Sequence, residues 1–198
     1  SVPDVRRYLR QFLMDGRVID IPLLARAAVV YGCILPFRPR RSAEAYRQIW
    51  TPEGSPLVVT SRRLRDKLQA ELQQPVELAM RYGNPSVGHA LARLAAQDVR
   101  RVLIFPMFPH YAMSSYESAV VSVRETAAEW HPQLEVSVVP PYYDEPGYID
   151  SLVHAARPHL STMPDHLLFS FHGMPIRHLR KAGREPHTCY CHQSIATM

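Results

Sequence analysis

The sequence is poor in cysteine and lysine, and each shortage narrows the class of protein. Its 198 residues include 3 cysteines, an odd and low number that argues against a disulfide scaffold and predicts a reducing, cytoplasmic setting. Only Lys67 and Lys181 are lysines among the 23 basic residues. The others are arginines, whose planar guanidinium suits carboxylate and phosphate ligands as well as a solvated surface.

Phosphate-binding loops and long hydrophobic runs are also missing. Neither a G-x-G-x-x-G nor a Walker pattern occurs, which disfavours a nucleotide-binding protein. The longest mainly apolar run, residues 27–37, is shorter than the roughly 20 residues needed to span a bilayer. No secretory signal is visible at the amino terminus. The short arginine clusters lack interleaved aromatic residues, so we expect no nucleic-acid partner.

What is present is a globular composition, 46% hydrophobic and 21% charged, with apolar residues spaced as in helices that alternate with short strands. This alternation predicts an α/β fold, a parallel sheet flanked by helices. The expected helices cover residues 1–14, 21–35, 42–50, 57–73, 87–95, 116–130 and 148–160, and the expected strands cover residues 76–82, 102–108, 134–139 and 167–171.

The carboxyl ends of the expected strands are rich in aromatic residues, proline and histidine. Ligands of an open parallel sheet bind at these ends. His172 follows the apolar segment 167–171 and precedes Gly173 and Pro175, a position that would hold its ring at the mouth of the sheet. Imidazole titrates near neutrality and binds borderline metals, so His172 is the main candidate for a catalytic or metal-binding residue. The alternative is a histidine that only forms a hydrogen bond within a loop.

Several motifs resemble those of the ferrochelatase family. Residues 168–175, Leu-Phe-Ser-Phe-His-Gly-Met-Pro, are similar to its signature of a strand that ends in Ser-x-His-(Gly/Ser)-x-Pro. Residues 6–13 resemble its first helix, and residues 34–57 resemble its bacterial members closely. Two further motifs, residues 80–85 and 108–111, follow in the family's order. The resemblance therefore extends over essentially the whole chain.

The resemblance implies two similar α/β domains with a porphyrin cleft between them. It places the first domain at residues 1–165 and the start of the second at residues 166–198. The family begins with a strand that ends in Asn-Leu-Gly-Thr-Pro or similar, and it draws a glutamate from the second domain. Neither is found here, so we expect a partial chain that lacks the first strand and most of the second domain.

The resemblance also implies the roles of individual residues. His172 matches the cleft histidine that accepts protons, binds the metal, or does both. Arg38 and Ser55 match positions that face the porphyrin propionates. The remaining matches are cleft positions, and together they fit an apolar disc with two carboxylates: Tyr46, Arg81, Tyr82, Phe108 and Pro109. Phe108 replaces a tyrosine of the family's Tyr-Pro-x-Tyr motif.

Cys189, Cys191 and His192 form a cluster that resembles a metal site only superficially. Zinc and iron–sulfur sites need four ligands, with two residues usually separating paired cysteines. Here one residue separates them and no second pair exists, so a helix start is the preferred interpretation. Met113 replaces the cluster cysteine of animal members, and we expect no iron–sulfur cluster.

The predicted function is the insertion of ferrous iron into protoporphyrin, with no cofactor beyond the substrate iron. Two alternatives remain: a two-domain α/β protein that binds a small ligand or tetrapyrrole without chemistry, and a chelatase for another metal or porphyrin. The apolar segment 21–37 is either a wall of the pocket or a peripheral membrane contact of a cytoplasmic protein.

Overall fold

The computed structural model describes residues 1–160, 164–170, 172–173 and 175–181. Within them the chain divides into two compact units. Unit 1 comprises residues 1–104 and 118–137, and unit 2 comprises residues 105–117 together with the described residues from 138 onward. Helices dominate both units, and none of the described helices is both long and apolar enough to cross a membrane.

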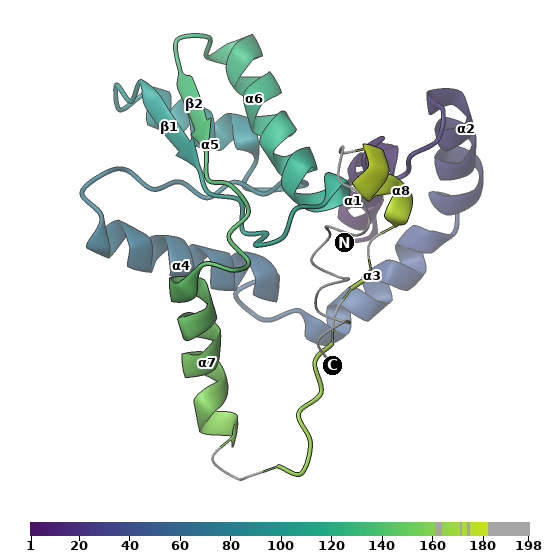
Figure 1. The fold of residues 1–198 in the computed structure, drawn as a ribbon. Helices are drawn as coiled ribbons and strands as arrows, with labels where there is room; N and C mark the ends of the chain where they lie inside the picture. The colour runs from purple at the N-terminus through teal and green to yellow at the C-terminus, as the bar shows by residue number, and fades with distance from the viewer. Residues whose placement is uncertain (161–163, 171, 174, 182–198) are drawn as a thin grey trace. The chain divides into compact units, whose positions relative to one another are not determined.

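The first half of unit 1 consists of helices, of which α1, α2 and α3 lie near one another and α4 lies apart (Figure 1). Helix α1 packs against α3 and contacts the short helix α2 and the π-helical turn η1 that continues it. A buried cluster of Leu9, Leu13, Val30 and Leu35 joins α1 to η1 and the residue that follows it. The bounds are α1 (Val2–Met14), α2 (Leu23–Ala27), η1 (Ala28–Ile34), α3 (Arg38–Ile49) and α4 (Pro56–Glu71).

The second half of unit 1 is a small α/β element. Strands β1 (Arg101–Ile104) and β2 (Glu135–Val138) are neighbours in a two-stranded parallel sheet. Helix α6 (Ser118–Trp130) connects them and packs against α5 (Val87–Ala95). A second buried cluster, Val87, Leu91, Ala127 and Leu134, lies between these helices and the sheet. The α/β fold class is therefore confirmed.

Unit 2 contains the turn η2 (Met113–Glu117), helix α7 (Pro146–Leu160) and helix α8 (Ile176–Lys181). Tyrosines connect its segments. The Tyr142 amide donates to the Pro109 carbonyl at 3.0 Å, and the Tyr142 hydroxyl donates to the Pro106 carbonyl at 3.1 Å. The Tyr116 hydroxyl donates to the Val139 carbonyl at 2.8 Å. These bonds join residues 105–117 to residues 138–148.

The helices agree with the sequence prediction better than the strands do. Helix α5 has the expected residues, but the strand expected at 102–108 ends at Ile104. Pro106 explains this end, because proline has no amide hydrogen for a strand ladder. The strand expected at 76–82 is wrong: this segment forms only one parallel bridge, between Met80 and Ser86, and so lacks a ladder.

The strand expected at 167–171 is also wrong over the residues that the structure describes. Residues 167–170 have no regular structure, and residue 171 lies outside the described residues. Leu168 is 91% exposed. A buried strand needs neighbours on its edges and faces, and none pairs with this segment in the described part of the chain. The predicted boundary at residue 165 does not coincide with the division into units and stays a prediction.

Candidate functional site

A buried polar cluster, which we call the Asp15 cluster, joins three parts of unit 1. It consists of Asp15 at the carboxyl end of α1, Arg81 and Tyr82 in the segment before α5, and Ser118 at the start of α6. Arg81 donates from Nη2 to Asp15 Oδ2 and from Nε to Ser118 Oγ, both at 2.6 Å. The Tyr82 hydroxyl donates to the same Asp15 oxygen at 2.9 Å, and the Ser118 hydroxyl also donates to it.

Burial makes these bonds important for the stability of unit 1. The Asp15 side chain is 5% exposed and Ser118 is 0% exposed. Burial alone would raise the pKa of Asp15, but hydrogen bonds from Ser118, the Arg17 amide and Tyr82 outweigh it and lower the pKa. A buried carboxylate is tolerated when it is paired and hydrogen-bonded, and Asp15 meets both conditions.

Tyr82 connects the Asp15 cluster to a layer of aromatic rings. Its ring lies 5.3 Å from Phe12 and 6.3 Å from Tyr8 between centroids, both edge to face. Tyr8 and Phe12 stack on each other at 5.8 Å, and the Arg81 guanidinium carbon lies 4.4 Å from the Tyr82 ring centroid. Burial raises the pKa of Tyr82 to about 12, so this hydroxyl is a hydrogen-bond donor at neutral pH. The layer is partly buried, because Tyr8 and Phe12 also pack against the buried cluster of Leu9, Leu13, Val30 and Leu35.

The aromatic layer also lies close to two predicted residues of α3. Burial raises the pKa of Tyr8, the neighbouring Tyr46 raises it further, and the positive charge of Arg38 lowers it. Arg38 and Tyr46 therefore lie within electrostatic reach of the Tyr8 hydroxyl. Tyr8 thus has two predicted site residues, Arg38 and Tyr46, near its hydroxyl and a third, Tyr82, against its ring.

Ser55 occupies the N-cap position of α4 and has an extended backbone conformation. Its side chain makes no hydrogen bond to the first turn of the helix. Its carbonyl accepts from the Val59 amide at 2.9 Å. Ser55 is half-buried, and its hydroxyl is not used as a helix cap.

The other three predicted residues belong to unit 2. Phe108 is exposed, and Pro109 uses its carbonyl to bind the Tyr142 amide. His172 is exposed, and its Nδ1 lies 2.7 Å from the carbonyl oxygen of its neighbour Gly173. Among the described residues, no three His, Cys, Asp or Glu side chains converge to hold a metal ion. Cys189, Cys191 and His192 lie outside the described residues.

The sequence did not indicate Asp15 or Ser118 as site residues. Asp15 was interpreted only as the end of the first helix, a role that it does have. Asp15 and Ser118 are 103 positions apart, and no local pattern predicts that a serine will bind a carboxylate so distant in the chain. Tyr8 and Phe12 are one helical turn apart on α1, and both pack against the buried cluster of Leu9, Leu13, Val30 and Leu35.

Comparison with known proteins identifies the family. The profile of the ferrochelatase family matches residues 1–198. A ferrochelatase of Opitutus terrae is 50% identical over 185 residues, which are 92% of this chain and 54% of that protein. Ferrochelatases of Pseudomonas fluorescens and Stutzerimonas stutzeri are 50% and 48% identical over 182 and 192 residues, or 53% and 55% of their lengths. The chain belongs to the ferrochelatase family, and it spans about half the length of these curated relatives.

Proposed function

We propose that the complete protein inserts ferrous iron into protoporphyrin to form haem. The observation that carries this proposal is the family match over the whole chain, together with about half of all residues being identical to those of curated ferrochelatases. Protoporphyrin and ferrous iron are then the substrates. The aromatic layer and arginines of unit 1 support the proposal, because a porphyrin is an apolar disc that carries two carboxylates.

The proposed binding residues have distinct tasks. Arg38 and Ser55 bind the propionates, for which the guanidinium of an exposed Arg38 is suited. Tyr46 and Tyr82 contact the macrocycle, and Phe108 and Pro109 line the cleft. Arg81 commits Nε and one terminal nitrogen to Ser118 and Asp15, so its main task is to hold Tyr82 in place.

The chemistry requires the removal of two pyrrole protons as the metal enters. A flat macrocycle hides the nitrogen lone pairs, so a cleft that binds the bent form favours the transition state over the ground state. His172 accepts protons, binds the incoming iron, or does both. A general base of this kind contributes about 10²–10⁴-fold to the rate.

We propose that the protein uses no iron–sulfur cluster. The support is the sequence: Cys189 and Cys191 are separated by one residue, and Met113 replaces the animal cluster cysteine. The protein then binds iron only as a substrate and not as part of a cofactor. Iron analysis of the purified complete protein, together with its visible spectrum, tests this; cluster absorption with stoichiometric iron and sulfide would contradict it.

We also propose that segment 21–37 gives the cytoplasmic protein a peripheral membrane contact. Its Val30 and Leu35 are buried, whereas Leu24, Val29 and Phe37 are exposed, so one face is available for a bilayer. Val29→Glu should reduce co-sedimentation with liposomes and leave turnover in detergent unchanged. Ile34 packs against the core, and Ile34→Glu should instead impair folding. Loss of detergent activity in Val29→Glu would identify this face as a wall of the porphyrin pocket.

The main proposal is tested by incubating the complete protein with zinc and protoporphyrin and monitoring metal insertion by fluorescence. We expect the emission of the free base to be replaced by that of zinc protoporphyrin at a rate proportional to protein concentration. Tight binding of porphyrin without metallation would indicate a tetrapyrrole-binding protein. Insertion with cobalt or nickel but not with iron or zinc, or with another porphyrin only, would indicate a different chelatase.

A further inference from the structure

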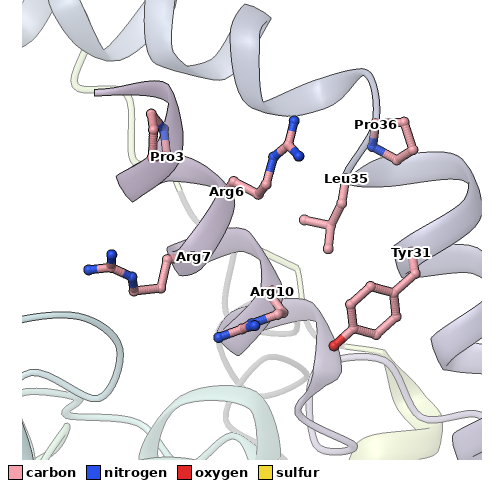
Figure 2. Close-up of a pocket in the computed structure, with 7 residues that line it drawn as sticks. All are labelled: Pro3, Arg6, Arg7, Arg10, Tyr31, Leu35 and Pro36. Carbon is pink, nitrogen blue, oxygen red and sulfur yellow. The ribbon is translucent and has the colours of Figure 1, made fainter.

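A pocket of about 480 Å³ lies between α1 and the carboxyl end of η1 (Figure 2). Arg6, Arg7 and Arg10 line it, and Figure 2 shows their guanidinium groups pointing in different directions. These arginines therefore do not converge on one bound group. In unit 2, by contrast, several contacts are directed at one short segment, residues 105–109, which contains two residues of the proposed porphyrin cleft.

Segment 105–109 follows β1 directly and forms neither helix nor strand. Its Pro106 and Pro109 have no amide hydrogen, so these two residues can be held through their backbone only at the carbonyl oxygens. Phe108, between them, is 38% exposed, so burial alone does not fix its ring. The orientation of Phe108 therefore depends on whatever holds the two proline carbonyls.

Tyr142 holds both of these carbonyls. Its amide donates to the Pro109 carbonyl at 3.0 Å, and its hydroxyl donates to the Pro106 carbonyl at 3.1 Å. The two carbonyls lie on either side of Phe108 in the chain. One tyrosine, contributed from outside the segment, thus fixes the backbone both before and after the Phe108 ring.

Tyr142 is itself firmly placed. Its ring centroid lies 5.0 Å from that of Phe105 and 5.5 Å from that of Tyr148, which belongs to the first turn of α7. Its carbonyl accepts from the Glu145 amide at 3.2 Å, in the turn that leads into the helix. Burial raises the pKa of Tyr142, and Tyr148 raises it further, so the Tyr142 hydroxyl remains a hydrogen-bond donor at neutral pH.

We propose that Tyr142 is a positioning residue that holds Phe108 in the wall of the porphyrin cleft, an inference that rests on the function proposed above. Without the Tyr142 hydroxyl, segment 105–109 would keep its bond at Pro109 and lose its bond at Pro106. Phe108 would then sample more orientations in the free protein, and this freedom would have to be lost when porphyrin binds. Because Phe108 transfers neither proton nor metal, the effect should appear in the KM for porphyrin and not in kcat.

The variant Tyr142→Phe tests the proposal in the complete protein, because it removes one hydroxyl and keeps the ring. Initial rates of zinc insertion at varied protoporphyrin concentration give kcat and KM separately. The KM for protoporphyrin should rise about twofold to tenfold, the range expected for one neutral hydrogen bond, and kcat should stay unchanged.

Two control variants make the same chemical change elsewhere in unit 2. Tyr148→Phe removes a hydroxyl that has no hydrogen-bond partner among the residues that the structure describes. Tyr116→Phe breaks a hydroxyl–carbonyl bond of 2.8 Å to Val139, outside segment 105–109. Both variants should leave the KM for protoporphyrin unchanged. Tyr116→Phe also shows what the loss of such a bond does to stability alone, as measured by thermal unfolding.

A double-mutant cycle with Phe108→Ala separates positioning from a general structural role. If Tyr142 acts through Phe108, Tyr142→Phe should have little effect on KM once the Phe108 ring is gone. Effects of the two substitutions that simply multiply would show that Tyr142 does not act through Phe108, and the proposal would be wrong.

The remaining outcomes also decide the matter. Normal insertion by the wild type with an unchanged KM in Tyr142→Phe overturns this inference alone and leaves the proposed function intact. An equal rise of KM in Tyr116→Phe, or a loss confined to kcat in Tyr142→Phe, overturns it as well, because neither result is specific to the porphyrin wall. A wild-type protein that neither binds nor metallates protoporphyrin contradicts the proposed function, and this inference with it.

Discussion

Two predicted site residues, Arg81 of unit 1 and His172 of unit 2, are held in different ways. In unit 1, Arg81 is bonded to Asp15, 66 positions away, and to Ser118, 37 positions away. In unit 2, the described contact of the His172 ring is with the next residue, Gly173. Residues that are fixed by long-range contacts contribute to the stability of the fold as well as to the site. Substitutions in the Asp15 cluster should therefore affect both stability and activity, whereas replacing His172 should affect activity alone.

The largest effect on stability is expected from Asp15→Ala. It removes the acceptor for Arg81, Tyr82 and Ser118, and breaking a buried ion pair costs about 3 kcal/mol or more. Denaturant unfolding of the complete protein measures this cost. Asp66→Ala is the matched control: the Asp66–Arg65 pair has the same 2.6 Å separation, but Asp66 is 64% exposed.

A surface pair of this kind is worth about 0–1 kcal/mol. Equal costs for Asp15→Ala and Asp66→Ala would show that the Asp15 cluster does not stabilise unit 1 in the way we describe. The comparison between the two units would then lose its physical basis.

Ser118→Ala should have a smaller effect, about 1–3 kcal/mol, because it removes a fully buried hydroxyl that accepts from Arg81 Nε and donates to Asp15. Thermal unfolding is a suitable measurement. Ser122→Ala on the same helix makes the same chemical change at a half-buried position outside the cluster and should be close to neutral. A Ser122→Ala cost as large as that of Ser118→Ala would indicate that helix α6 is sensitive to serine loss in general.

The contribution of Asp15 to stability should decrease in acid. Its pKa is lowered in the folded protein, so the carboxylate stabilises the fold above the unfolded pKa of about 4 and loses this effect as the pH falls through the folded value. The difference in unfolding free energy between the wild type and Asp15→Asn should narrow below about pH 4. A difference that does not change with pH would contradict the assigned ionisation.

The smallest effect is expected at alkaline pH. Because burial raises the pKa of Tyr82 to about 12, its stabilising contribution is complete below pH 10 and is lost as the pH rises towards 12. The difference in phenolate absorbance between the wild type and Tyr82→Phe reports the ionisation of Tyr82. This difference should therefore rise in a single step near pH 12. A difference titration centred near the ordinary pKa of tyrosine, about 10, would show that Tyr82 is solvated.

Much of the fold could be predicted from local patterns, and the exceptions have physical causes. The apolar spacing of residues 87–95 identified α5 correctly, because helical hydrogen bonds are local. Strands depend on neighbours that are often distant in the chain, so the strands expected at 76–82 and, over the described residues, at 167–170 were wrongly assigned. Motif resemblance predicted roles in the cleft for Arg81 and Tyr82, which stay predictions, but it gave no indication of the buried carboxylate that holds them. Asp15 became recognisable only through its three-dimensional contacts.

The measurement that tests the account most directly is a comparison of His172→Ala with the wild type in the complete protein. Unfolding, protoporphyrin affinity and ferrous iron insertion should be measured on the same preparations. The account predicts unchanged stability, retained porphyrin binding and a loss of insertion of about 10²-fold or more. Near wild-type insertion by His172→Ala would contradict the chemical role of this histidine. A large loss of stability in that variant would contradict the difference between the two units.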